Sequence, residues 1–168
     1  MKVRLSMRAS LAAVFLPLAV LHLHAQWPTS SAGAQAQPGS AFSIPQAQLI
    51  QPEALSRLLT AAAAEKPLVF QVGSHVLFAQ AHIPGAEYVG PGSQPAGLQA
   101  LQSRVNSLPR KSFIVLYCGC CPWTRCPNIE PAFAKLQEMG FTNVKVLYLA
   151  DNFGADWASK GYPVEQGR

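Results

Sequence analysis

Charged side chains are scarce in this 168-residue sequence, at 12%, and cysteine is absent outside one short stretch, residues 118–126. Three of the 13 lysines and arginines fall within the first eight residues, so the rest of the chain carries ten cations against eight acidic residues. A chain this close to neutral, with no basic stripe, is not expected to bind nucleic acid. Four clustered cysteines also differ from the dispersed pairs of a disulfide-framework domain.

The first 25 residues have the three parts of a secretory signal peptide. A positively charged start is followed by an apolar run over residues 11–23 and by a cleavage site at Leu23-His24-Ala25. The alternative is an uncleaved membrane anchor, but the apolar run is too short to span a bilayer comfortably. We therefore expect cleavage, no stable membrane span afterwards, and a periplasmic or secreted protein in a compartment where disulfides can form.

The segment after the signal peptide, residues 26–43, is rich in Ser, Ala, Gln, Pro and Gly. Trp27 and Phe42 are its only bulky apolar residues, so it cannot bury enough surface to order itself. We interpret it as a disordered linker. The remaining residues, 44–168, suit one globular domain and contain no internal repeat.

Strand and helix patterns alternate along this domain. Strands are expected at residues 49–50, 68–72, 88–89, 113–117 and 144–149, and helices at 52–64, 75–80, 98–108, 128–139 and 153–160. This alternation predicts an α/β fold, with a mainly parallel sheet and helices on both faces. Ligands of such sheets bind beyond the carboxyl ends of the strands, and Cys118 stands at such an end.

The cysteine-rich stretch connects the strand at 113–117 to a helix for which Asn128 is the expected N-cap. Its cysteines are Cys118, Cys120, Cys121 and Cys126. A loop in this position directs backbone N–H groups and the positive end of the helix dipole at its contents. Arg125 adds a full positive charge. We therefore expect the thiolate form of cysteine, which is both nucleophile and metal ligand, to be favoured here.

Four segments, in this order, carry a resemblance to a known family. They are His82-Ile83-Pro84-Gly85-Ala86, the strand and cysteine at 113–118, residues 140–144, and a C-terminal signature of Phe153, Trp157, Gly161, Tyr162, Pro163 and Val164. With these segments, the chain from about residue 50 to 167 resembles a single, exported rhodanese-like domain. The resemblance implies a rhodanese-like α/β fold.

The resemblance also implies sulfurtransferase activity. In this family a cysteine takes the sulfane sulfur of a donor such as thiosulfate, becomes a persulfide, and passes the outer sulfur to an acceptor such as cyanide or a thiol. By position the nucleophile is Cys118, and backbone N–H groups from Gly119 to Arg125 are expected to stabilise its anions. The candidate substrate-binding residues are Gly119, Trp123, Thr124 and Arg125. Neither a cofactor nor a metal is expected for this activity.

The sequence departs from the family pattern in three places. The cysteine loop is longer than the compact family loop and holds three further cysteines. Gln71-Val72-Gly73 stands where the family often has Asp-x-Arg, and Asp151-Asn152 replaces a frequent Gly-Gly. We interpret the Gln71 segment as divergence without loss of activity.

The three further cysteines allow three interpretations. One of Cys120, Cys121 and Cys126 is a resolving thiol for the Cys118 persulfide; or the loop binds copper(I) or zinc, which thiolates select; or a disulfide from Cys126 to Cys120 or Cys121 braces the loop. The alternative functions are accordingly a thiol–disulfide oxidoreductase and a periplasmic soft-metal-binding protein. The expected partners are a small sulfur-containing anion, a thiol or cyanide acceptor, and an exported redox partner protein.

Overall fold

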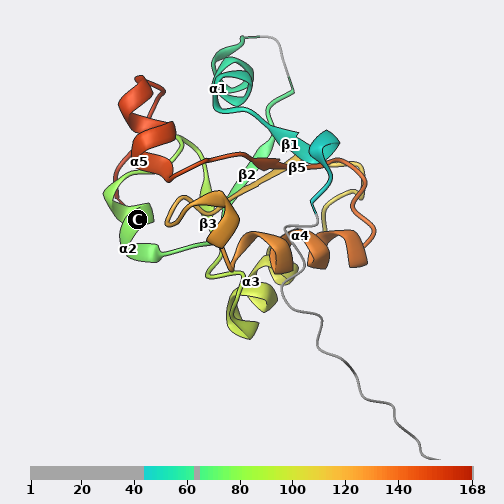
Figure 1. Cartoon of the computed structure of the whole chain (residues 1–168). Coiled ribbons are helices and arrows are strands. Elements are labelled where there is room, and N and C mark those ends of the chain that lie inside the picture. The colour runs from blue at the N-terminus through green and yellow to red at the C-terminus, as the bar shows by residue number, and fades with distance from the viewer. Residues whose placement is uncertain (1–43, 63–64, 168) are drawn as a thin grey trace, which may run out of the picture. The chain divides into compact units, whose positions relative to one another are not determined.

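The computed structural model describes residues 44–62 and 65–167 (Figure 1). The expected signal peptide and linker lie outside these residues. Within the described part of the chain, no helix combines the length and the apolar character needed to cross a membrane.

The domain is built on one five-stranded sheet in which every strand pairs in parallel with its neighbours, as the alternating pattern predicts. The strands, in the spatial order β1-β5-β4-β2-β3, are β1 (Leu49–Ile50), β5 (Val144–Leu147), β4 (Ile114–Tyr117), β2 (Leu68–Gln71) and β3 (Glu87–Tyr88). Gln71 at the end of β2 is in register with Tyr117 at the end of β4. The two strands therefore stop together, and Cys118 leaves the sheet at its carboxyl edge.

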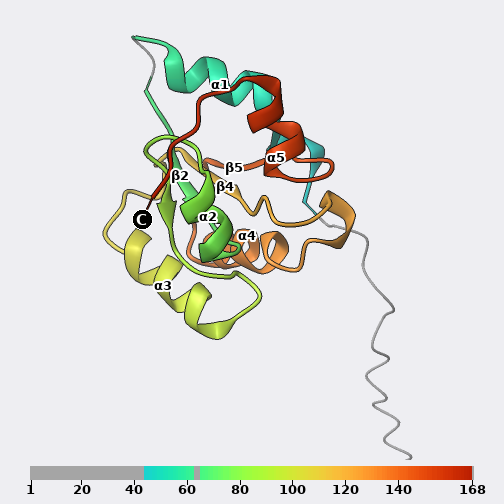
Figure 2. The same ribbon diagram turned by 90° about the vertical axis from the view of Figure 1, so that its left-hand side faces the viewer.

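Helices follow the strands on both faces of the sheet (Figures 1 and 2). They are α1 (Pro52–Thr60), α2 (His75–Gln80), α3 (Pro95–Val105), α4 (Ile129–Glu138) and α5 (Phe153–Asp156), with short 3-10 turns at Gln46–Gln48, Trp123–Arg125 and Ala158–Lys160. On one face, α3 and α4 share a core with the sheet. On the other face, Leu55 of α1 and Phe153 of α5 belong to a second core.

Three helices differ in their boundaries from the expectation. The helix expected over residues 98–108 runs from Pro95 to Val105, since proline suits the first turn of a helix. The helix expected over residues 52–64 ends at Thr60, because Ala61 is already extended and the alanines that follow offer no large side chain to bury. The helix expected over 153–160 is divided at Trp157, which lies outside the helical region at φ −123°, ψ −66°. The Trp157 side chain is fully buried and its indole N–H donates to the carbonyl of Pro163, so this residue serves the core rather than the helix.

Side chains of β4 alternate between the two cores, as the period of a strand requires. Ile114, Leu116 and Cys118 face the core with α3 and α4. Val115 and Tyr117 face the core with α1 and α5. This alternation directs the Cys118 side chain toward the start of α4.

Gly97 of α3 provides a test of the packing between this helix and the turn after β3. A Cβ at this position would collide with the backbone of Pro91 and of Gly90. Because backbone atoms cannot move aside as a flexible side chain can, we expect Gly97→Ala to lower the free energy of unfolding by ~1–3 kcal/mol. Alanine otherwise stabilises a helix relative to glycine, so the clash reverses the usual sign.

Urea denaturation of the mature chain measures this change. Gln99→Ala is the matched control, because Gln99 is exposed on the same helix, and its effect should stay within about 0.5 kcal/mol. A Gly97→Ala protein as stable as this control would contradict the packing described here.

Candidate active site

Cys118 is held against the segment that follows β2. The Val72 N–H donates to the Tyr117 carbonyl at 2.9 Å, which brings Gly73 beside Cys118. A Cβ on Gly73 would lie 2.8 Å from the Cys118 carbonyl oxygen and 2.9 Å from its Sγ. The glycine is therefore required by the close approach of the two chains.

The side chain of Gln71, a residue only 2% exposed, also holds Cys118 and Gly73 together. Its Nε2 donates to the Cys118 carbonyl at 2.9 Å, and its Oε1 accepts from the Gly73 N–H at 3.1 Å. From the sequence, Gln71 was interpreted only as a divergence from the family's Asp-x-Arg pattern, so this role of its side chain was missed. The available signal was a polar residue at the carboxyl end of an otherwise apolar strand.

The loop after Cys118 uses several of its N–H groups to fold itself. Trp123 donates its N–H to the Ala150 carbonyl at 3.0 Å, and Arg125 donates to the Pro122 carbonyl at 2.9 Å. The expectation that N–H groups up to Arg125 surround the Cys118 sulfur is therefore wrong for these two. The Cys120 N–H does act on Cys118 and favours its anion.

The four cysteine sulfurs gather into a closed ring at the start of α4. The Cys118 Sγ lies 3.0 Å from the Cys120 Sγ, which lies 3.4 Å from the Cys121 Sγ. The Cys126 side chain completes the ring through hydrogen bonds with those of Cys118 and Cys121. All four are free thiols or thiolates in this structure. The sulfurs of Cys118, Cys120 and Cys121 lie within 4.8 Å of one another, which is close enough to hold one soft metal ion.

The pKa shifts of the four cysteines alternate in direction around the ring. The pKa of Cys120 is lowered to about 6, chiefly by the hydrogen bond from Cys118. The pKa of Cys126 is also lowered to about 6, again chiefly by Cys118. Burial raises the pKa of Cys121 to about 12. The pKa of Cys118 is raised, first by its hydrogen bond to Cys120. This raised pKa runs against the expectation that Cys118 itself is the resting thiolate, and the lowered values make Cys120 and Cys126 the sulfurs more readily ionised.

Asn128 is buried beside this ring and was expected only as a helix cap. Its side chain makes no cap hydrogen bond, and its backbone is already helical at φ −94°, ψ −30°. Instead, Nδ2 donates to the Cys118 sulfur at 3.3 Å and approaches the Cys120 sulfur at 3.8 Å. Its Oδ1 accepts from the N–H and the hydroxyl of Ser93, at 3.1 and 2.8 Å. Because a backbone N–H can only donate, Ser93 fixes the amide with its NH₂ group toward sulfur.

The start of α4 acts on a different cysteine from the one expected. The backbone N–H groups of Asn128 and Ile129 favour the thiolate of Cys126. Free N–H groups at the start of a helix stabilise anions in this way. The positive end of the helix therefore stabilises the thiolate of Cys126 directly, and it acts on Cys118 only through the hydrogen bond between Cys118 and Cys126.

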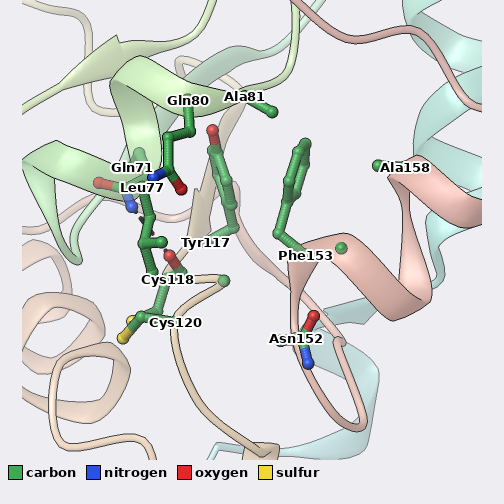
Figure 3. Close-up of a pocket in the computed structure, with 12 residues that line it drawn as sticks. Gln71, Leu77, Gln80, Ala81, Tyr117, Cys118, Cys120, Asn152, Phe153 and Ala158 are labelled. Carbon is green, nitrogen blue, oxygen red and sulfur yellow. Dashed lines mark hydrogen bonds between the residues drawn. The ribbon is translucent and has the colours of Figure 1, made fainter.

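A cavity of about 370 Å³ opens at the carboxyl edge of the sheet, with Cys118 and Cys120 in its wall. Figure 3 shows the two cysteines together, with their sulfurs turned away from the neighbouring rings of Tyr117 and Phe153. Besides the two cysteines, the cavity is lined by the polar groups of four side chains: the amides of Gln71, Gln80 and Asn152 and the hydroxyl of Tyr117. Among the described residues, no lysine, arginine, aspartate or glutamate lines this cavity.

The four candidate substrate-binding residues do not all reach this cavity. Gly119 lines it, but Trp123, Thr124 and Arg125 form a 3-10 turn elsewhere in the loop. The Trp123 ring packs on Tyr148 with their centroids 5.2 Å apart, and Thr124 and Arg125 are exposed. Their roles in substrate binding stay predictions.

Several solved structures are similar to this chain in fold. A solved rhodanese-like domain from Anabaena sp. is 21% identical over 71% of this chain and 79% of its own, with a TM-score of 0.52. A Bacillus halodurans protein is 24% identical over 70% of this chain and 76% of its own, with a TM-score of 0.54. EanB is 23% identical over 71% of this chain but only 27% of its own, with a TM-score of 0.51.

At these identities the solved structures establish the fold. No curated protein matches the sequence. The family model for the rhodanese-like domain matches residues 51–149, which is more than half of the chain and includes β2, β4 and the cysteine ring. The chain therefore belongs to the rhodanese-like domain family.

Proposed function

We propose that this protein is a sulfurtransferase that carries sulfane sulfur as a persulfide on Cys118. The observation that carries the proposal is the 3.0 Å contact between the sulfurs of Cys118 and Cys120, two residues that also line the cavity. This contact supplies a nucleophile and a base in one pair. A solved form of EanB is described as a cysteine persulfide with ergothioneine, so persulfide chemistry is documented on a related fold.

In the first step Cys120 acts as the general base. Its thiolate takes the proton of the Cys118 thiol across their hydrogen bond. The new Cys118 thiolate attacks the sulfane sulfur of thiosulfate, the Cys118 Sγ–S bond forms, and the bond to the sulfite sulfur breaks. Sulfite leaves with the electron pair, and Cys118 is left as an anionic persulfide.

The groups around Cys118 suit this change of charge. The Asn128 amide donates to its sulfur at 3.3 Å, and the backbone N–H of Cys120 also favours its anion. Gln71 and Gly73 hold the Cys118 backbone, so these donors need little rearrangement. The cavity offers side-chain amides rather than cations to the donor, which suits hydrogen bonding to the oxygens of a small sulfur-containing anion.

Loss of the nucleophile tests the proposal. We expect Cys118→Ser to lower sulfite release from thiosulfate by about 10³-fold or more, because a hydroxyl at this position cannot hold sulfane sulfur. After thiosulfate, the intact mass of the wild-type protein, alkylated without reduction, should show either one added sulfur atom or the loss of two alkylatable thiols in the cysteine loop, and that of the variant should show neither. Ser103→Ala is the control, since Ser103 is exposed on α3. Full sulfite release by Cys118→Ser would rule the proposal out.

The pH dependence tests the role of Cys120. Because the base must be ionised and the pKa of Cys120 is about 6, sulfite release should rise as the pH increases through about 6 and then level off. Asn128→Leu removes a hydrogen bond that favours the Cys120 thiolate, so its midpoint should move to higher pH. Single-turnover sulfite release across the pH range measures both midpoints.

Ser93→Ala is the matched control for this second test. It removes the hydroxyl donor but leaves the backbone N–H that also holds the Asn128 amide, so its midpoint should move less than that of Asn128→Leu. A wild-type midpoint near 8.5, the ordinary value for cysteine, would exclude Cys120 as the base.

A further inference from the structure

We infer that the persulfide is resolved inside the protein: Cys120 attacks Cys118, hydrosulfide leaves, and a Cys118–Cys120 disulfide remains for an external dithiol to reduce. This inference rests on the proposed function, because it begins from the Cys118 persulfide. It extends that function from sulfur transfer to reductive release of sulfide.

The distance between the two sulfurs is the first support. They are 3.0 Å apart, and a disulfide bond is about 2.05 Å long, so a movement of about 1 Å joins them. The turn between them is imposed by the backbone. Gly119 has φ +76°, and a Cβ on it would lie 2.9 Å from the Phe153 Cβ. The chain therefore bends back at Gly119 and holds Cys120 over Cys118.

The exposure of the two cysteines is the second support. Cys118 is 4% exposed, whereas Cys120 is only partly buried and also lines the cavity. The inner sulfur of the persulfide is therefore less accessible to a thiol from solution than to Cys120, which already touches it. A neighbouring group already in contact reacts at a much higher effective concentration than a thiol from solution.

The step balances with groups already present. Cys120 holds the proton that it took from Cys118 during persulfide formation. This proton passes to the terminal sulfur of the anionic persulfide, which restores the Cys120 thiolate. The thiolate attacks the Cys118 Sγ, the Sγ–Sγ bond forms, and the bond to the terminal sulfur breaks. The terminal sulfur leaves with that electron pair and the proton, as hydrosulfide. Cys118 and Cys120 are oxidised to a disulfide, and the sulfane sulfur is reduced to sulfide.

The disulfide must then be reduced for a second turnover. An external dithiol, small or carried by a protein, attacks the more accessible sulfur, that of Cys120. It leaves as a disulfide and restores both cysteines. This requirement defines the chemistry of a partner: a dithiol with a lower reduction potential than the Cys118–Cys120 pair.

A single turnover tests the inference. The reduced mature protein is mixed with one equivalent of thiosulfate, without added reductant; sulfite and hydrosulfide are measured, and the free thiols are alkylated for mass mapping. We expect about one hydrosulfide per sulfite and a disulfide mapped to Cys118 and Cys120. In Cys120→Ser the ratio should fall below about 0.1, with the sulfur retained on Cys118. The ratio of hydrosulfide to sulfite is measured, rather than a rate, because loss of Cys120 as the base also slows formation of the persulfide.

Cys121→Ser is the matched comparison, because it removes a neighbouring thiol but leaves the attacking pair. Its ratio should stay near one. A wild-type protein that releases sulfite, keeps the sulfur on Cys118 and releases no hydrosulfide would overturn the inference and leave the proposed function standing. Absence of both sulfite and sulfur uptake would instead remove the proposed function. Hydrosulfide release that persists in Cys120→Ser would show that Cys120 is not the resolving residue.

Discussion

The parallel pairing of β2 with β4 is the constraint on which the site depends. Their register ends both strands at the same level and places Cys118 against Gln71 and Gly73. The alternation of side chains along β4 then turns the Cys118 sulfur toward the start of α4, where Asn128 and Cys126 are buried. A shift of one residue in this register would send the sulfur to the opposite core. The sulfur ring is thus a consequence of sheet geometry as much as of cysteine content.

Burial explains why the ring shares its protons instead of ionising fully. Adjacent thiolates at 3.0 to 3.4 Å would repel strongly in a region with little solvent. Protons on Cys118 and Cys121 turn two of these repulsions into hydrogen bonds, which lower the pKa of Cys120 and of Cys126. The Asn128 amide and the N–H groups at the start of α4 supply the remaining stabilisation. These contacts favour thiolates in the ring although no lysine or arginine lines the cavity wall.

The sequence was sufficient for the fold and for the position of Cys118. Apolar runs, glycine stops and the order of strands and helices predicted the parallel sheet, and the family resemblance is confirmed. It was insufficient for Gln71 and Asn128, because their hydrogen bonds join residues that are 47 and 10 positions apart. It also did not predict that the pKa of Cys118 is raised while those of Cys120 and Cys126 are lowered. Spacing along the chain indicates which sulfurs are close, but only their three-dimensional contacts decide which one donates its proton.

The longer loop changes the expected fate of the persulfide. The family resemblance predicts a loop whose backbone N–H groups stabilise the persulfide anion. Here Trp123 and Arg125 use their N–H groups to fold the loop, and sulfur atoms occupy part of the surroundings of Cys118. A thiol or thiolate at 3.0 Å is a reactant as well as a neighbour. Under the proposed function, the loop that directs fewer N–H groups at the persulfide therefore also supplies the sulfur that consumes it.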